Sequence, residues 1–172
     1  MNKKLQPIVQ ALEKEFGAEV SDVFGETQAV IPVENIVATC ELLRDKFSFG
    51  LLSMITAVDY GLQAEPRFHI IYQLNSITDS LFLTLRVPVS GENPSIPTMT
   101  GVYKNANWRE REIWDLFGIH VEGHPDLRRL LMPKDWEGYP LRKDYPLGYE
   151  EPQFSFNFDE IDLSKPKGEL AL

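Results

Sequence analysis

Two histidines four residues apart are the side chains of this chain that come closest to a metal-site pattern. His120 and His124 flank Glu122, and on an α-helix this spacing places two imidazoles on one face, as zinc sites require. Gly123 lies between the histidines and Pro125 follows them, and both residue types disfavour a helix. The metalloprotease motif also has a glutamate directly after its first histidine, which is missing here. The pattern therefore favours two loop histidines that make hydrogen bonds.

Acid–base and nucleophilic catalysis find little support in the chain. Glu110 and Glu112 are two residues apart, so on a helix they point to different faces. No serine stands in a Gly-x-Ser-x-Gly turn, and no glycine-rich phosphate loop is present. The single cysteine, Cys40, excludes an intramolecular disulfide and an iron–sulfur cluster held by this chain alone. Its place on an apolar helical stripe predicts a buried core residue.

The segment 108–146 is dense in Trp, Arg, Asp, Gly and Pro. It holds eight acidic and seven basic residues, whereas the rest of the chain holds 18 and 10. Arginine and aromatic side chains are favoured at the centres of protein interfaces, and loops fixed by proline lose little entropy on binding. The segment is therefore predicted to be a docking surface. The alternative is that it forms part of the domain's own core, with polar residues at its edges.

Composition limits the partners of the 172-residue chain. Its formal net charge of −9 repels phosphate backbones, so no nucleic-acid partner is expected. No apolar run approaches the ~18 residues that a membrane span needs, and the N-terminal residues lack the apolar stretch of a secretory signal. If the protein works at a membrane, another component must hold it there.

The elements that position these residues predict an α+β domain. Apolar residues at helical spacing predict helices over 5–16 and 35–47. Strand patterns, the first two joined as a hairpin, cover residues 20–24, 28–33, 50–60, 67–74 and 81–89. We expect two layers, with the helices packed on one face of a mostly antiparallel sheet.

A third helix is predicted at the start of the dense segment. Asn107 is expected to be its N-cap, with Glu110 as the capping-box partner, and the helix ends at Phe117 before Gly118. Two ion pairs are expected along it, Arg109 with Glu112 and Arg111 with Asp115.

The chain divides at residue 146. Residues 1–146 are expected to form one domain, and 147–172 an extended acidic C-terminal arm with a net charge of −4. Phe154, Phe156 and Phe158 alternate in this arm, which predicts that it packs on another surface or folds back over its own domain.

The dense segment resembles a known family. The carrying residues are Glu110-Arg111-Glu112-x-x-Asp115-Leu116-Phe117-Gly118-Ile119, then Gly123-His124-Pro125-Asp126-Leu127-Arg128-Arg129, then Asp135-Trp136-Glu137-Gly138-Tyr139-Pro140-Leu141-Arg142-Lys143-Asp144-Tyr145-Pro146. They closely resemble the C-type subunit of proton-translocating NADH:quinone oxidoreductase, respiratory complex I. The match is strongest over residues 105–150.

The resemblance implies a peripheral-arm subunit without catalytic residues. It implies a chain that binds no cofactor or metal itself, within a complex that uses NADH, FMN, iron–sulfur clusters and quinone to couple electron transfer to proton translocation. It implies packing on the D-type subunit, which forms the quinone cavity, and a place on the cytoplasmic side of the cell membrane through the complex alone.

The motif residues are expected to act at the interface or to hold the motif's own structure. They are Glu110, Arg111, Glu112, Asp115, Phe117, Gly118, His124, Pro125, Arg128, Arg129, Trp136, Tyr139, Pro140, Arg142, Lys143, Asp144 and Tyr145.

Two alternatives stay open from the sequence. Related subunits occur in membrane-bound hydrogenases and in F420H2 or ferredoxin:quinone complexes, any of which could host this chain. A stand-alone metal enzyme using His120, His124 and Glu122 or Glu112 is the alternative from another class.

Overall fold

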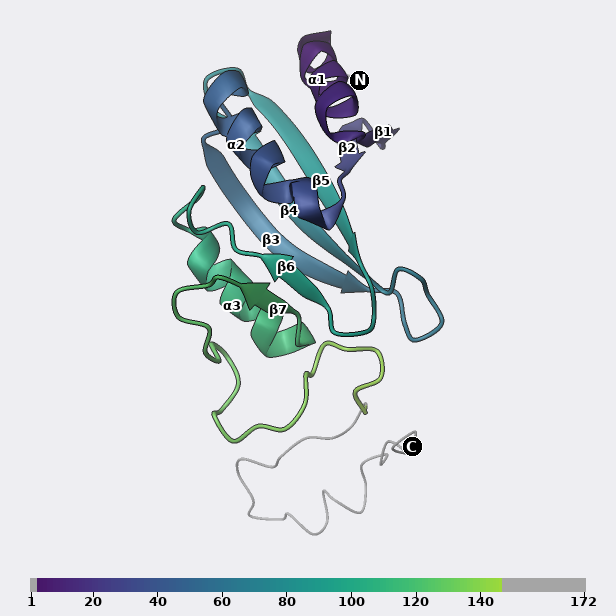
Figure 1. Cartoon of the computed structure of the whole chain (residues 1–172), viewed down its shortest axis with the longest axis vertical. Coiled ribbons are helices and arrows are strands. Elements are labelled where there is room, and N and C mark those ends of the chain that lie inside the picture. Colours follow the sequence, from purple (N-terminus) through teal and green to yellow (C-terminus); the bar gives the residue numbers. More distant parts are fainter. Residues whose placement is uncertain (1–2, 147–172) are drawn as a thin grey trace.

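The computed structural model describes residues 3–146 (Figure 1). The helices are the short 3-10 turns η1 (Lys3–Leu5) and η2 (Val33–Asn35), and α1 (Gln6–Phe16), α2 (Ile36–Phe47) and α3 (Ala106–Phe117). The strands are β1 (Glu19–Val23), β2 (Glu26–Val30), β3 (Leu51–Asp59), β4 (Phe68–Ser76), β5 (Leu81–Val89), β6 (Ser95–Pro97) and β7 (His120–Glu122). The predicted α+β class is confirmed, and the predicted arm over 147–172 lies outside the described residues.

Five strands form one sheet in the order β1-β2-β5-β4-β3, and β6 pairs with β7 apart from it. Every neighbouring pair in the large sheet is antiparallel except β2 and β5, which run parallel. The predicted hairpin of β1 and β2 is confirmed. It turns through Phe24 and Gly25, both at positive φ, which keeps the twist of the two strands matched.

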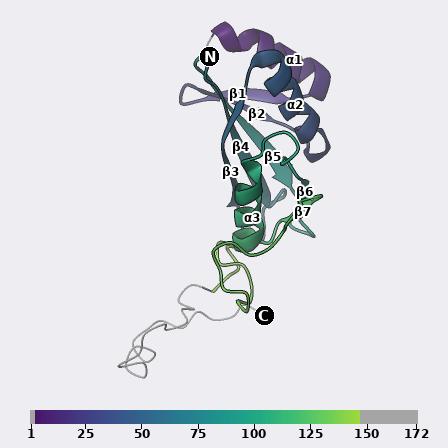
Figure 2. The ribbon, with the colours of Figure 1, turned by 90° about the vertical axis from the view of Figure 1, so that its left-hand side faces the viewer.

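Helices α1 and α2 cover one face of the large sheet (Figures 1 and 2). Along β4, Phe68, Ile70 and Tyr72 are fully buried, whereas His69 between them is only half-buried on the opposite face. Residues 81–89 alternate as predicted except at Thr84, which is also buried. Cys40 of α2 is fully buried in the core, as its apolar stripe indicates.

Helix α3 packs along β3 and carries the first residues of the dense segment. It begins one residue before Asn107, so the predicted cap is wrong. The chain is anchored there by Asn105 instead, whose side chain donates to the Leu52 carbonyl of β3 at 2.6 Å. Glu110, the expected capping-box partner, is fully buried and bonds elsewhere. The helix ends as predicted, with Gly118 at a φ of 69°.

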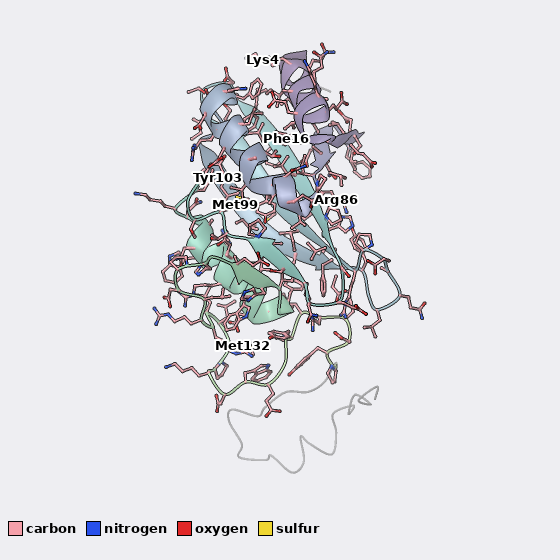
Figure 3. The ribbon with its side chains drawn as sticks, viewed as in Figure 1. Lys4, Phe16, Arg86, Met99, Tyr103 and Met132 are labelled. Carbon is pink, nitrogen blue, oxygen red and sulfur yellow. The ribbon has the colours of Figure 1, made fainter. Side chains whose placement is uncertain are left out.

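Beyond α3 and β7 the chain runs through residues 124–146 with no further helix or strand. We call this segment the clamped loop. It lies beyond α3, at the end of the molecule farthest from α1 (Figure 1), and Met132 marks its place among the side chains (Figure 3). Within residues 3–146 no helix combines the length and the apolar character needed to cross a bilayer.

Candidate functional site

Asp115 of α3 anchors the clamped loop. Its side chain is fully buried, and Oδ2 accepts the backbone N–H groups of Leu130, Leu131 and Met132 at 2.9, 2.7 and 2.9 Å. Oδ1 accepts a hydrogen bond from Nη1 of Arg129 at 2.8 Å. Burial alone raises the pKa of Asp115, but these donors outweigh it and hold the pKa below its ordinary value of 3.8. The carboxylate is therefore a charged anchor with its oxygens fully engaged.

Two arginines extend this anchor along the loop. Arg129 donates from Nη2 to the carbonyls of Trp136 and Gly138 at 2.9 and 3.3 Å. Arg111 of α3 donates from Nε to the Arg128 carbonyl at 3.0 Å, and from Nη2 to the Arg129 carbonyl at 3.1 Å. Guanidinium groups suit this task because their donors are fixed in one plane. The loop backbone is thereby tied to α3 at several points.

The ion pairs predicted within α3 are half right. Arg109 and Glu112 pair at 3.5 Å on an exposed face, where such a pair adds little stability. Arg111 does not pair with Asp115, because Arg129 and three loop amides already occupy that carboxylate. Helical spacing indicates which side chains can meet, but it does not show whether residues after the helix bind the same carboxylate instead.

Glu110 is a second buried carboxylate on α3, and it holds the chain after β6. Its Oε1 accepts the backbone N–H of Met99, and Oε2 accepts the Thr98 hydroxyl at 2.7 Å. The Nε2 atom of His124 lies 3.8 Å from Oε2. Burial raises the pKa of Glu110, and these neighbours oppose the shift only in part.

The two histidines of the metal hypothesis have separate surroundings. The His124 ring accepts the Asp126 N–H at Nδ1 (3.0 Å), so Nε2 carries the proton and faces the Asn107 carbonyl at 3.2 Å. His120 is exposed on β7. No helix joins the two histidines, so their four-residue spacing does not place both imidazoles on one face as the zinc hypothesis requires. Among residues 3–146 no group of three or more His, Cys, Asp and Glu residues could hold a metal ion.

A second anchor for the clamped loop lies at the ends of β3 and β4. Asp59 binds Arg67 through two hydrogen bonds, Nε–Oδ1 at 3.0 Å and Nη2–Oδ2 at 2.8 Å. Arg67 also donates to Asp144 at 2.8 and 3.3 Å, and Asp59 accepts the backbone N–H groups of Lys143 (2.8 Å) and Gly61 (2.9 Å). The far end of the loop is thus fixed to the large sheet.

The electrostatics of this second anchor favour the charged forms. Burial raises the pKa of Asp59, but Arg67 and the two backbone donors together lower it to about 2. A hydrogen bond from Arg67 lowers the pKa of Asp144. Both carboxylates raise the pKa of the Arg67 guanidinium.

Sequence reasoning missed Asp59 and Arg67. A signal was available, because the two residues stand at the facing ends of neighbouring predicted strands, 50–60 and 67–74. An antiparallel pairing brings such ends together, and opposite charges there are expected to pair. Their role in holding Asp144 depends on a contact 77 residues along the chain, which spacing does not reveal.

Aromatic rings fill the space between α3 and the loop. A Cβ atom at Gly118 would lie 2.4 Å from the Tyr139 ring, so the glycine admits the ring at the helix end. Trp136 and Tyr145 stack with ring centroids 6.5 Å apart. The Arg142 guanidinium lies 5.4 Å from the centre of the Phe68 ring and 5.3 Å from that of Tyr139.

The remaining motif residues are spread over the helix end and the loop surface. Phe117 is buried, Arg128 is exposed and pairs with Asp126 at 2.9 Å, Lys143 is exposed, Pro125 is exposed and Pro140 is half-buried. The motif therefore supplies internal anchors as well as surface, and Arg129 and Asp144 belong to the anchors.

The arrangement gives this segment a defined shape and no free acid–base group at its anchors. Glu110, Asp115, Asp59 and Asp144 each accept specific hydrogen bonds within the chain. Outside these anchors, Trp108, Leu131 and Leu141 are exposed by 62%, 63% and 51%. A rigid loop with exposed apolar side chains is suited to contact another protein.

Comparison with known proteins finds relatives along most of the chain. The family model described as "Respiratory-chain NADH dehydrogenase, 30 Kd subunit" matches residues 29–151. The C-type subunit of the NADH-quinone oxidoreductase from Roseiflexus sp. (strain RS-1) is 47% identical over 144 residues, which cover 83% of this chain and 82% of the relative. Its counterpart from Geobacter sulfurreducens is 43% identical over 139 residues, 79% of this chain and 86% of the relative.

Solved structures share the fold. A trypsin-resistant fragment of Nqo5 superposes with a TM-score of 0.64 and 32% identity, covering 72% of this chain and 99% of the fragment. A chain of an archaeal membrane-bound sulfane sulfur reductase gives a TM-score of 0.72 at 26% identity, covering 84% of this chain and 86% of its own length. The extent of the family match and the identity to named relatives show that this chain belongs to the family of the respiratory-chain NADH dehydrogenase 30 kDa subunit, the C-type subunit of NADH-quinone oxidoreductase.

Proposed function

We propose that the chain is a structural, non-catalytic subunit in the peripheral arm of an NADH:quinone oxidoreductase, supporting assembly of the complex that passes electrons from NADH to quinone. One observation carries this proposal above others. The charged residues of the family motif anchor the clamped loop to α3 and to β3–β4, which leaves a rigid surface with exposed Trp108, Leu131 and Leu141.

The anchors support a structural role over a chemical one. A general acid or base needs a proton-accepting atom within reach of a substrate. Asp115 has both oxygens bonded to loop donors, and Glu110 is buried against Met99 and Thr98. On this proposal the chain holds no cofactor, and the NADH, FMN, iron–sulfur clusters and quinone belong to other subunits.

The proposed partners are the neighbouring subunits of the peripheral arm, chiefly the D-type subunit that forms the quinone cavity. Membrane association then comes through the complex, on the cytoplasmic face of the cell membrane. The names of the relatives support the host complex, and the net charge of −9 opposes a nucleic-acid partner.

Affinity purification from native membranes tests this function. The tagged full-length chain is extracted in mild detergent, its partners are identified by mass spectrometry, and NADH-driven quinone reduction is measured on the eluate. We expect peripheral-arm subunits and NADH:quinone activity in the same fraction. Recovery of the chain alone from wild-type membranes contradicts the proposal.

A related host complex is the second candidate. The structural likeness to a chain of a sulfane sulfur reductase favours it, since that complex is described as an archaeal respiratory membrane complex. The same purification separates the two candidates. Partners of another oxidoreductase, without NADH oxidation, retain the structural role and change the host.

A further inference from the structure

A polar groove of about 630 Å³ lies where the small β6–β7 sheet meets the clamped loop. Asn93, Ser95, His120, Glu122 and Arg142 are among the side chains that line it. They come from three separate parts of the chain, brought together by the pairing of β6 with β7 and by the two anchors of the loop. The groove is open to solvent, so a side chain of another molecule can enter it.

Arg142 is the unusual residue of this groove. Its guanidinium lies over the faces of the Phe68 and Tyr139 rings, and such faces attract a cation. Its Nε atom is buried and has no hydrogen-bond partner among residues 3–146. The other arginines of the described chain all have a polar partner. Arg109 forms an ion pair with Glu112. The rest donate to a carboxylate, a carbonyl or a tyrosine hydroxyl, namely Arg44, Arg67, Arg86, Arg111, Arg128 and Arg129.

The nearby carboxylates, Asp144 and Glu122, accept hydrogen bonds from other donors among residues 3–146 and none from Arg142. Asp144 feels the charge of Arg142, but both of its oxygens accept hydrogen bonds from Arg67. Glu122 lines the same groove, and its Oε1 accepts the Ser95 hydroxyl at 2.8 Å. Arg142 therefore presents a positive charge without a hydrogen-bonded anion in the described part of the chain.

We propose that this groove receives an acidic side chain of a neighbouring subunit, and that Arg142 is its ligand. The inference rests on the proposed structural function and names one contact of it. The two rings attract the guanidinium to this place, where an entering carboxylate can meet its N–H donors. A charged hydrogen bond of this kind is stronger than a neutral one. Docking also removes water from the groove, which strengthens the pair.

Removing the charge of Arg142 is the first test. Arg142→Gln is compared with wild type and with Arg109→Gln, which removes an exposed arginine from α3. Each full-length chain is expressed in cells that lack the native copy, and the amount recovered in the assembled complex is measured. We expect Arg142→Gln to lower recovery at least fivefold and Arg109→Gln to leave it within twofold of wild type.

Chemical cross-linking then identifies the owner of the carboxylate. In the double variant Arg142→Lys with Lys143→Arg, position 142 carries the amine and position 143 does not. A zero-length carbodiimide joins this amine to a contacting carboxylate, and mass spectrometry maps the bond. Lys143→Arg alone is the matched control. A bond from position 142 to an acidic residue of another subunit supports the proposal.

Four results overturn it. A bond to residues 147–172 of the same chain means that the chain supplies its own anion, and no bond at all in the assembled double variant means that no carboxylate enters. Normal assembly of Arg142→Gln also contradicts the inference. If Arg142→Gln lowers the melting temperature of the full-length chain well below that of Arg109→Gln, the side chain serves the fold instead. Failure of the wild-type chain to join any complex rejects the proposed function itself.

Discussion

The two buried carboxylates of α3 look alike in the sequence, but their pKa values are shifted in opposite directions. Asp115 faces four hydrogen-bond donors that outweigh its burial, so its pKa is lowered. Glu110 faces fewer donors and its pKa is raised. The difference lies in the supply of donors, which comes from loops that follow or precede the helix.

Neutral amide substitutions are expected to separate these residues. Asp115→Asn removes the charge and points the new amide N–H group at the N–H donors of the loop. It should therefore lower the free energy of unfolding by about 3 kcal/mol. Glu110→Gln keeps an acceptor for Met99 and can donate to Thr98, so its cost should stay below about 1 kcal/mol. Urea denaturation of the full-length variants measures both. Equal losses of unfolding free energy in the two variants would contradict the different roles given to Asp115 and Glu110.

Asp59 is expected to make stability depend on acid. Its pKa is about 2 in the folded chain against an ordinary value of 3.8, so the folded state binds its proton less readily than the unfolded state. The resulting stability, about 2 kcal/mol, is fully present above pH 4 and is lost as the pH falls from about 4 toward 2. Unfolding free energies of wild type and Asp59→Asn should therefore converge over this interval. If the difference in unfolding free energy between wild type and Asp59→Asn stays constant over this pH interval, Asp59 is not the source of the acid dependence.

At the scale of elements, the end of α3 and the clamped loop form one unit. Gly118 ends the helix in a left-handed conformation and also leaves the space that Tyr139 fills. Leu141 donates its backbone N–H to the carbonyl of Leu116 in the last turn of the helix, at 3.1 Å. The helix end and the loop therefore stabilise each other.

Two glycine substitutions test this unit. Gly17, which ends α1 at a φ of 64°, has nothing within 4 Å of an added Cβ, so Gly17→Ala should cost only about 1 kcal/mol of backbone strain. Gly118→Ala adds a clash with Tyr139 and should cost at least about 2 kcal/mol. In a Tyr139→Ala background the cost of Gly118→Ala should fall to that of Gly17→Ala. Thermal denaturation measures each step, and an unchanged cost in that background rejects the clash.

The element pattern shows how far the sequence leads. Hydrophobic periodicity predicted the first two helices and the strands of the large sheet, because burial on one face imposes those periods. The third helix was predicted from its capping residues, Asn107, Glu110 and Gly118. The start of α3 was misplaced because the chain before it is held by a bond from Asn105 to the Leu52 carbonyl of β3, a long-range contact that local spacing does not reveal. The prediction that Glu110 is a capping-box partner was wrong for a related reason. Its hydrogen-bond partners, Thr98 and Met99, lie in the chain before the helix.

At the scale of the whole molecule, the clamped loop and the β4–β5 turn lie at opposite ends (Figure 1). Both carry exposed apolar side chains: Leu131 and Leu141 on the loop, and Ile77, exposed by 76%, at the turn. Of these three side chains, Leu131 and Leu141 belong to the clamped loop, which the two anchors fix to the rest of the domain, and Ile77 does not.

Assembly should therefore respond to one end and not the other. The double variant Leu131→Asp with Leu141→Asp should lower the amount of chain recovered in the complex at least tenfold, because charge at a buried contact is costly. Ile77→Asp is the control and should assemble normally. Melting temperatures of the isolated full-length chains should stay within a few degrees of wild type. Equal assembly of both variants refutes the loop as the docking surface.

The motif alone identified the segment and its family, but it did not separate anchors from surface. Arg129 and Asp144 were expected among the contacts to a partner or to the chain's own loops, and they bond internally to Asp115 and Arg67. Arg67 lies far outside the motif. Such long-range pairs depend on sheet register and loop path, and neither is encoded by local spacing.

The second anchor also sets an order in time during synthesis. Asp59 and Arg67 are eight residues apart and can meet as soon as the β3–β4 hairpin forms, whereas the bond from Lys143 to Asp59 spans 84 residues. At about 5–20 residues per second, a ribosome needs roughly 4–17 s to supply that distance. Both partners of this ion pair are thus synthesised well before Lys143. The second anchor can therefore be completed only after the ribosome has added residues 143 and 144, long after Asp59 and Arg67 have been made.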